Sequence, residues 1–115
     1  MSYPKFAIFR NADGLYFFRL YNHKGKNLVT GFPCEQRVQC ITAIRELYAH
    51  AEKDHHYRMQ IAHGQFYFQM TDERHTVICT SRLYRTMAGM AYGIKSVKDN
   101  AIIAVIEDHT TAEVT

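Results

Sequence analysis

The chain has 115 residues, of which 47% are hydrophobic and 22% are charged, and its formal net charge at pH 7 is +3. This composition is typical of one compact globular domain and excludes an intrinsically disordered chain. Acidic residues lie among the basic ones, and no apolar run reaches the roughly 18 to 20 residues that span a bilayer, so neither a duplex nucleic-acid binder nor a membrane-spanning protein is indicated.

Three strands are predicted at the start of the chain. Residues 5–9 form the first, which ends at a turn over residues 11–14, where Asn, Asp and Gly occur. Nearly continuous apolar residues predict the second strand over 15–21, and a third follows over 26–30. The pattern returns at 55–61, 65–70 and 76–80. Alternation within these strands predicts the residues that face the core, which are Tyr16, Phe18, Leu20, Phe66, Phe68 and Met70.

A change to helical periodicity follows each set of three strands. The apolar positions that predict these two amphipathic helices are Val38, Ile41, Ile44 and Leu47 in the first half, and Met90, Ala91, Ile94, Val97 and Ala101 in the second. We expect Thr86 to cap the second helix. Glycine inside a helix costs about 0.5 to 1 kcal/mol relative to alanine, so we expect a close approach to the sheet at Gly93. An extended segment returns after each helix, at 55–61 and 102–107.

These elements make up an internal repeat with a shift of fifty residues. Residues 14–51 align with residues 64–101 without a gap, and the identical pairs are Gly14 and Gly64, Phe18 and Phe68, Thr30 and Thr80, Ile44 and Ile94, and Ala51 and Ala101. A unit of about fifty residues is marginally stable alone. We therefore predict one domain over residues 1–115, with a first repeat at about 5–54, a second at about 55–110, and a tail at 111–115.

Three segments of the second half resemble the YegP-like family of small bacterial and archaeal proteins: residues 64–70, 78–84 and 93–101. The resemblance extends from Lys5 to about Thr110 in a tandem, two-copy form. It implies an α+β fold in which two β3-α-β repeats build one continuous, mostly antiparallel sheet, exchange their last strands and pack two helices on it. The chain would then be its own pseudo-dimer. No catalytic or ligand-binding residues come with the family, because its members are uncharacterised as to function.

Histidine and cysteine are the side chains of this sequence that could bind a metal or act as a nucleophile. The closest histidines are His55, His56 and His63, but adjacent strand residues point to opposite faces, so we predict no metal site and no cofactor. A metal site remains the lesser alternative. Cys34 lies near a predicted helix start, where a thiolate is stabilised, but its counterpart is the bulky Tyr84, which favours a packing role.

The sequence also bears on compartment and on catalysis. The three cysteines, Cys34, Cys40 and Cys79, show no Cys-x-x-Cys spacing, and no signal-peptide core is present, so we expect reduced thiols in a soluble, cytoplasmic protein without a membrane partner. No nucleophile elbow, zinc-binding helix or phosphate-binding glycine loop occurs. We therefore predict that the protein is not an enzyme, although a site assembled across strands would leave no linear motif.

Alternation assigns a group of aromatic, basic and amide side chains to the face of the sheet away from the helices. The candidate binding residues are Phe17, Arg19, Tyr67, Gln69 and Arg58, with Arg10 expected nearby. We predict a small non-catalytic binding or protein-interaction module, whose partner is another protein or a second copy. The alternative is a single-stranded nucleic-acid binder, because exposed aromatic rings stack on bases and cations contact phosphates. The absence of any specific ligand is the third possibility.

Overall fold

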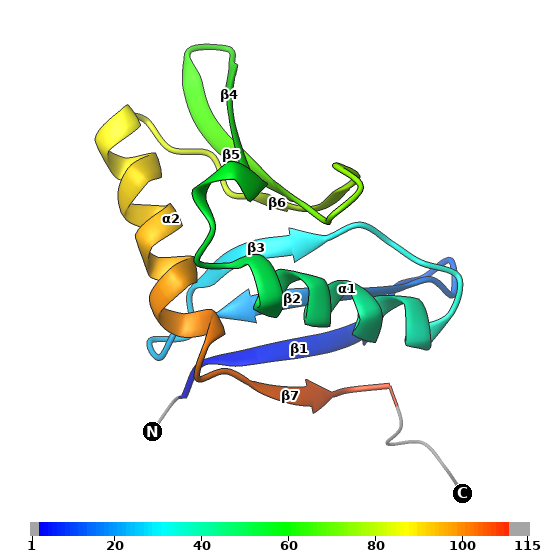
Figure 1. Cartoon of the computed structure of the whole chain (residues 1–115). Coiled ribbons are helices and arrows are strands. Elements are labelled where there is room, and N and C mark those ends of the chain that lie inside the picture. The colour runs from blue at the N-terminus through cyan, green and yellow to red at the C-terminus, as the bar shows by residue number, and fades with distance from the viewer. Residues whose placement is uncertain (1–2, 111–115) are drawn as a thin grey trace, which may run out of the picture.

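The computed structural model describes residues 3–110, which form a seven-stranded sheet with two helices packed on one face (Figure 1). The helices are α1 (Arg37–His50) and α2 (Met87–Ala101), and a short 3-10 turn, η1 (Asp54–His56), precedes β4. The strands are β1 (Lys5–Arg10), β2 (Tyr16–Tyr21), β3 (Asn27–Gly31), β4 (Tyr57–Ala62), β5 (Gln65–Thr71), β6 (Val77–Ser81) and β7 (Val105–Asp108). The predicted α+β fold is confirmed.

The sheet has the order β4-β5-β6-β3-β2-β1-β7, and only β1 and β7 pair in parallel. Strand pairing recurs with the shift of fifty residues: Arg19 lies opposite Thr30 between β2 and β3, and Gln69 lies opposite Thr80 between β5 and β6. Each half is therefore a three-stranded antiparallel unit followed by a helix. The duplication and the boundary near residue 54 stay interpretations of the sequence.

The strand that follows each helix joins the other half of the sheet. β7 follows α2 and pairs with β1, while β4 follows α1 and pairs with β5, as the expected exchange of last strands requires. β4 therefore has two places in the pattern. It is the strand that returns after α1, and it is also the first strand of the second half. Among residues 3–110 no helix is long and apolar enough to cross a membrane.

One hydrophobic core lies between the sheet and the two helices. The predicted core residues Phe18, Leu20, Phe68 and Met70 are at most 1% exposed, and the helices add Cys40, Ile44, Leu47, Met90 and Val97. Tyr16 and Phe66 pack at its margin. Val38 is 60% exposed, so its predicted place on the buried face is wrong. The buried side chains of α1 recur from Cys40 at intervals of three or four residues, which turns Val38 toward solvent.

The start of α2 is as predicted, and its glycine has a more specific role than expected. Thr86 Oγ1 accepts a hydrogen bond from the N–H of Gly89 at 2.9 Å. A Cβ atom at Gly93 would overlap the side chain of Tyr84, which stacks against Phe68 with ring centres 6.4 Å apart. The close approach is therefore to Tyr84, whose ring lies between the helix and the core.

Gly31 allows a similar close approach in β3. A Cβ atom there would overlap the ring of Phe18, with Cδ2 at 2.5 Å, and Phe18 is 1% exposed. The ring cannot move outward because it is enclosed by the core. Glycine at this position is therefore required by packing against Phe18.

We expect Gly31→Ala to lower the free energy of unfolding by about 1 to 3 kcal/mol, because the added methyl group overpacks the core. Phe18→Leu makes room at the same place, so the loss in the double variant should be smaller than the sum of the two single losses. Urea denaturation of the parent, the two single variants and the double variant measures these free energies of unfolding. Strict additivity would show that the Phe18 ring does not limit this position.

Candidate binding face

The face of the sheet without helices carries a row of side chains that crosses all seven strands. Each member is the direct cross-strand partner of the next, and the row runs from β7 to β4 through Glu107, Ala7, Arg19, Thr30, Thr80, Gln69 and Arg58. Side chains opposite each other on one face are close enough to interact. The row therefore places three predicted residues, Arg19, Gln69 and Arg58, on one continuous surface.

Arg19 lies against two aromatic rings on this face. Its guanidinium carbon is 5.5 Å from the ring centre of Phe17 and 5.8 Å from that of Phe9, and the two rings stack at 5.5 Å. His109 stacks on Phe9 at 5.1 Å. Arg19 Nε is buried and has no hydrogen-bond partner among the described residues. Cation–π contact thus holds a planar, charged hydrogen-bond donor in one orientation.

The other predicted residues lie in a second group on β4 and β5. Tyr67 is opposite Gln60, and Gln69 is opposite Arg58. Gln69 Nε2 donates to Thr80 Oγ1 at 3.3 Å, and Arg58 Nη2 donates to the carbonyl of His75 at 3.3 Å. β6 and β3 separate this group from β2, which corresponds to three strand spacings, or roughly 14 Å. The five predicted residues therefore form two groups joined by the threonines.

Arg10 does not belong to this face, so the expectation for it is wrong. It lies opposite Tyr16 in the ladder of β1 and β2, and its guanidinium carbon is 5.4 Å from the centre of the Tyr16 ring. Arg10 is an even number of residues from the buried Phe6 and Ile8, so strand alternation turns it to the helix side.

An acidic side chain ends the row at β7, and its charge is compensated. Glu107 receives hydrogen bonds from Tyr3 Oη at 2.9 Å and from His109 Nε2 at 2.8 Å, and Lys5 Nζ lies 3.1 Å away. The hydrogen bonds from Lys5 and then Tyr3 lower the pKa of Glu107. A shallow hollow of about 220 Å³ beside this group is lined by residues that include Tyr3, Lys5, Ala7 and Phe9. The helix-free face therefore extends to β7, where it ends in polar side chains that compensate the charge of Glu107.

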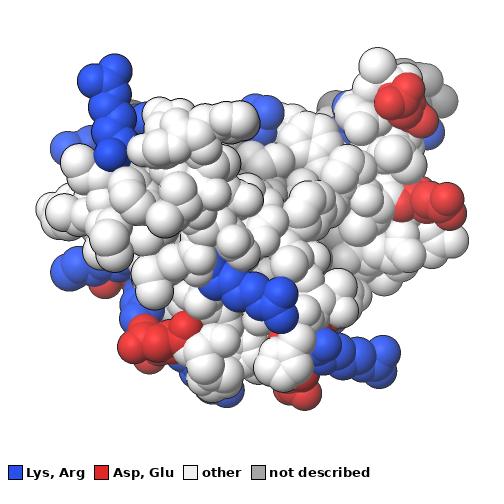
Figure 2. All heavy atoms as spheres, turned by 90° about the horizontal axis from the view of Figure 1, so that it is seen from above, with Lys and Arg blue, Asp and Glu red and all other residues white. Residues whose placement is uncertain are grey.

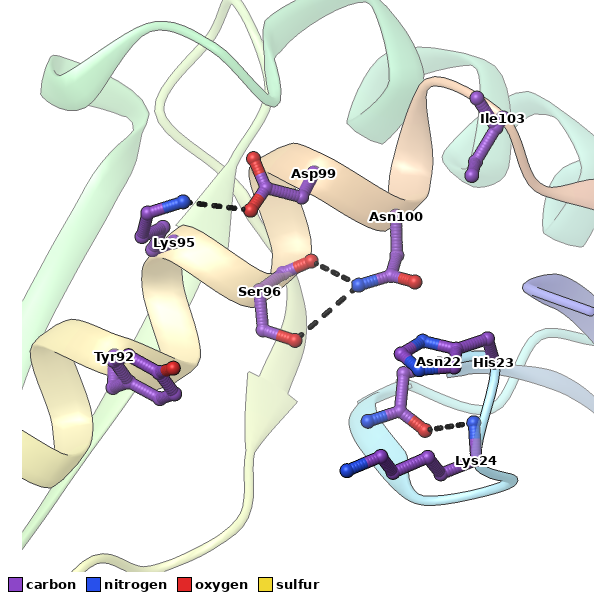
Figure 3. Close-up of a pocket in the computed structure, with 9 residues that line it drawn as sticks. All are labelled: Asn22, His23, Lys24, Tyr92, Lys95, Ser96, Asp99, Asn100 and Ile103. Carbon is purple, nitrogen blue, oxygen red and sulfur yellow. Dashed lines mark hydrogen bonds and ion pairs between the residues drawn. The ribbon is translucent and has the colours of Figure 1, made fainter.

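A polar hollow of about 420 Å³ lies elsewhere, between α2 and the turn that joins β2 to β3 (Figure 3). The polar residues on its α2 side pair with one another: Lys95 Nζ is 2.9 Å from Asp99 Oδ2, and Asn100 Nδ2 donates to the carbonyl of Ser96 at 2.7 Å. Asn100 also donates to Ser96 Oγ at 3.3 Å. Within the described part of the chain no base accepts a hydrogen bond from this serine hydroxyl, as activation of a serine nucleophile would require.

The histidines near β4 differ from the expectation. His55 and His56 lie in η1 and not in a strand, so the argument that they point to opposite faces is wrong. The ring of His56 stacks on His50 at 4.0 Å, and its Nδ1 lies 2.8 Å from the carbonyl oxygen of Thr71. Within residues 3–110 no three His, Cys, Asp or Glu side chains are arranged to hold a metal ion. The buried rings of His50 and His56 pack together between α1 and the sheet.

The thiols are free and shielded. Burial raises the pKa of Cys40 and of Cys79 to about 12, and it also raises the pKa of Cys34, which is partly exposed. Cys34 Sγ lies 3.6 Å from the carbonyl oxygen of Phe32, to which it donates. The surroundings of Cys34 thus favour the thiol over the thiolate, and this supports the packing role expected from the sequence.

Sequence comparison agrees with the fold. Residues 62–108 match a family model described as a domain of unknown function, DUF1508. The UPF0339 protein YegP of Escherichia coli K12 is 24% identical over 106 residues, which cover 91% of this chain and 96% of that protein. A UPF0339 protein of Acinetobacter baylyi is 27% identical over the same shares of the two chains. Over nearly its whole length the chain is therefore similar to proteins of the YegP-like family. The family model falls on the second half, where the YegP-like segments are best preserved.

Two solved structures share this fold over nearly their whole length. The solution NMR structure of E. coli yegP, described as a protein of unknown function, has a TM-score of 0.88 at 23% identity and covers 95% of each chain. That of a UPF0339 protein from Shewanella oneidensis has a TM-score of 0.88 at 21% identity and covers 100% of each. These YegP-like relatives establish the architecture and bring no biochemical activity with them.

Sequence reasoning missed several residues of this face, namely Phe9, Thr30, Thr80, Glu107 and His109. Thr30 and Thr80 gave a signal, because they are identical in the two halves and lie in strands. Phe9 and His109 contact each other across β1 and β7, two strands from opposite ends of the chain. Their contact depends on a parallel pairing that local sequence patterns do not specify.

We expect the cysteines to react slowly with a thiol reagent such as Ellman's reagent at pH 7.5. Cys40 and Cys79 should react only after unfolding, because burial holds their pKa near 12, and Cys34 should react more slowly than free glutathione. Absorbance at 412 nm, with and without denaturant, measures the rates. Labelling of Cys34 faster than glutathione would instead indicate an activated nucleophile.

Proposed function

We propose that the chain is a non-catalytic binding module that holds a segment of a partner protein on its helix-free face. The observation that carries the proposal is the placement of the Arg19 guanidinium against the rings of Phe9 and Phe17. A planar guanidinium fixed in this way is pre-organised to bind a carboxylate with two parallel hydrogen bonds. The rings beside it supply apolar contact area at little entropic cost.

The centre of the row favours an acceptor-rich ligand. Thr30 Oγ1 accepts a hydrogen bond from Asn27 Nδ2 at 3.0 Å, and Thr80 Oγ1 accepts one from Gln69 Nε2 at 3.3 Å. Because each hydroxyl oxygen already accepts, its own proton is available to a ligand. Arg19 and the two threonines then form a line of donors. The ligand chemistry that fits is an Asp, Glu or C-terminal carboxylate flanked by apolar side chains.

Two further observations support a binding role over catalysis. The polar side chains on the α2 side of the hollow are paired with each other, and the thiols are shielded. Three unpaired cysteines suit a reducing compartment, so the proposal includes a cytoplasmic location.

Phe17→Ala and Arg19→Lys should each weaken capture of the partner at least about tenfold, because one removes a stacking ring and the other removes the planar fork. The matched control is Tyr92→Ala, which truncates an aromatic ring that is 76% exposed on α2. The measurement is quantitative mass spectrometry of proteins captured from host lysate on each variant after nuclease treatment. A partner retained by Tyr92→Ala and lost from both face variants is the expected result.

The same variants separate this proposal from single-stranded nucleic acid. Fluorescence anisotropy with a labelled 12-mer of deoxythymidine reports direct binding. Tight binding that falls steeply between about 50 and 200 mM salt and is lost in Phe17→Ala would favour the nucleic-acid alternative. Capture that is equal on all four proteins would remove the helix-free face as the binding surface.

A further inference from the structure

The two ends of the sheet are unequal. At one end β7 lies outside β1, whereas at the other end β4 is the outermost strand and no described segment lies beyond it (Figure 1). Counted outward from the junction of β3 and β6, one half of the sheet has four strands and the other has three. The difference arises because β4 is both the strand that returns after α1 and the first strand of the second half. One strand position beside β4 is therefore unfilled.

The filled end shows what a strand in this position contributes. The N–H of His109 donates to the carbonyl of Ile8 at 3.0 Å, so the chain at β7 satisfies the outer edge of β1. Ile8 lies opposite Phe18, and Met59 lies opposite Phe68 in the corresponding place on β4. Ile8 is fully buried, whereas Met59 is 62% exposed. The corresponding position on β4 thus lacks the cover that Ile8 has.

The backbone groups of the free edge belong to Met59 and Ile61. Phe66 on β5 exchanges two hydrogen bonds with Tyr84, at 2.8 and 2.6 Å, so its backbone groups point away from β4. Its partner on β4 is Ile61, and this pair is therefore of the type without mutual hydrogen bonds. The N–H and C=O of Ile61, and by alternation those of Met59, point outward from the sheet.

Few features protect this edge from pairing. β4 pairs with β5 over six consecutive residues without a bulge, contains no proline, and has Arg58 as its only charged residue. Met59 and Ile61 are 62% and 70% exposed. Figure 2, seen from above and hence from the β4 end of Figure 1, shows a broad area without charged side chains, with Lys, Arg, Asp and Glu mostly around its margin. An edge of this kind is a template for another strand.

We propose that two copies of this chain associate through the free edge of β4, in antiparallel orientation, to form one continuous sheet. The edge is self-complementary: with Gln60 opposite Gln60 of the second copy, Met59 lies opposite Ile61 and Arg58 opposite Ala62. Apolar side chains then cover each other on the helix side, and no like charges meet. Met59 and Ile61 of the two copies also exchange the backbone hydrogen bonds that point outward.

A second copy fits this edge better than an unrelated peptide. One two-fold contact satisfies both free edges at once and closes the assembly, so no further strand position is left open. A shift of one residue would place Met59 and Ile61 opposite side chains of the other face. Shifts by one residue are therefore disfavoured. The contact consists of one strand of six residues from each copy, so association should be weak and concentration-dependent.

Sedimentation equilibrium on the full chain, from about 10 µM to about 1 mM, tests the association. We expect the weight-average mass to rise from 13.4 kDa toward twice that value. Ile61→Lys should keep the monomer mass throughout, because it puts a charge into the apolar contact, and Met59→Lys provides a second variant with the same expectation. The matched control is Val38→Lys on α1, which is 60% exposed and should associate like the parent. A parent that stays monomeric, or β4 variants that still associate, would overturn the proposal.

Cysteine cross-linking tests the register. In a Cys34→Ser background, Gln60→Cys should form a disulfide-linked dimer on mild oxidation, because this pair meets on the two-fold axis with Cα atoms about 4.5 Å apart. Arg58→Cys is the matched control on the same strand and face, and it should stay unlinked because it lies opposite Ala62. Cross-linking at Arg58 alone, or equally at both positions, would overturn the proposed pairing.

Discussion

The short pairing of β3 with β6 is the constraint on which this structure depends. Three residues of each strand, 29–31 and 79–81, join two antiparallel units into one sheet. Without this junction each unit would expose the apolar side of its strands to water, and about fifty residues bury too little surface to compensate. With it, Phe18 and Phe68 contribute to the same core, and α2 can run from the β5 end of the sheet to the strand that pairs with β1. The junction also places Thr30 beside Thr80, so it makes the row of side chains on the helix-free face continuous.

Most of the architecture follows from local patterns, and the exceptions have a common cause. Periodicity located every strand and both helices, because alternation and helical spacing are imposed by which side is buried. The shift of fifty residues that relates the two halves does not hold between β1 and β4. Leu20 pairs with Phe6, but Met70 pairs with Tyr57, which is fifty-one residues after Phe6. The turn between β4 and β5 has two residues and is shorter than the turn between β1 and β2. In addition, η1 occupies part of the segment that was expected to be extended.

The binding face was predictable only in part, for a related reason. Alternation along one strand tells which residues share a face, so Phe17 and Arg19 could be placed together from sequence. Whether side chains on different strands are neighbours depends on strand order and register. The threonine row and the contact of Phe9 with His109 both need that information. The error at Arg10 has a different origin, because β1 alternates without a break and Arg10 therefore shares the side of Phe6 and Ile8.

Pairing at the free edge of β4 would also determine how the helix-free faces of the two copies are oriented. A two-fold axis perpendicular to an antiparallel sheet leaves the same face of both copies on the same side. Two Arg19 sites would then point in one direction from a single continuous sheet. A partner that carries two acidic segments could bind both sites, and the second contact would form at a raised effective concentration. Weak association at β4 would thus be strengthened by a partner that bridges the copies, since the partner would bind the paired form more tightly than the single chain.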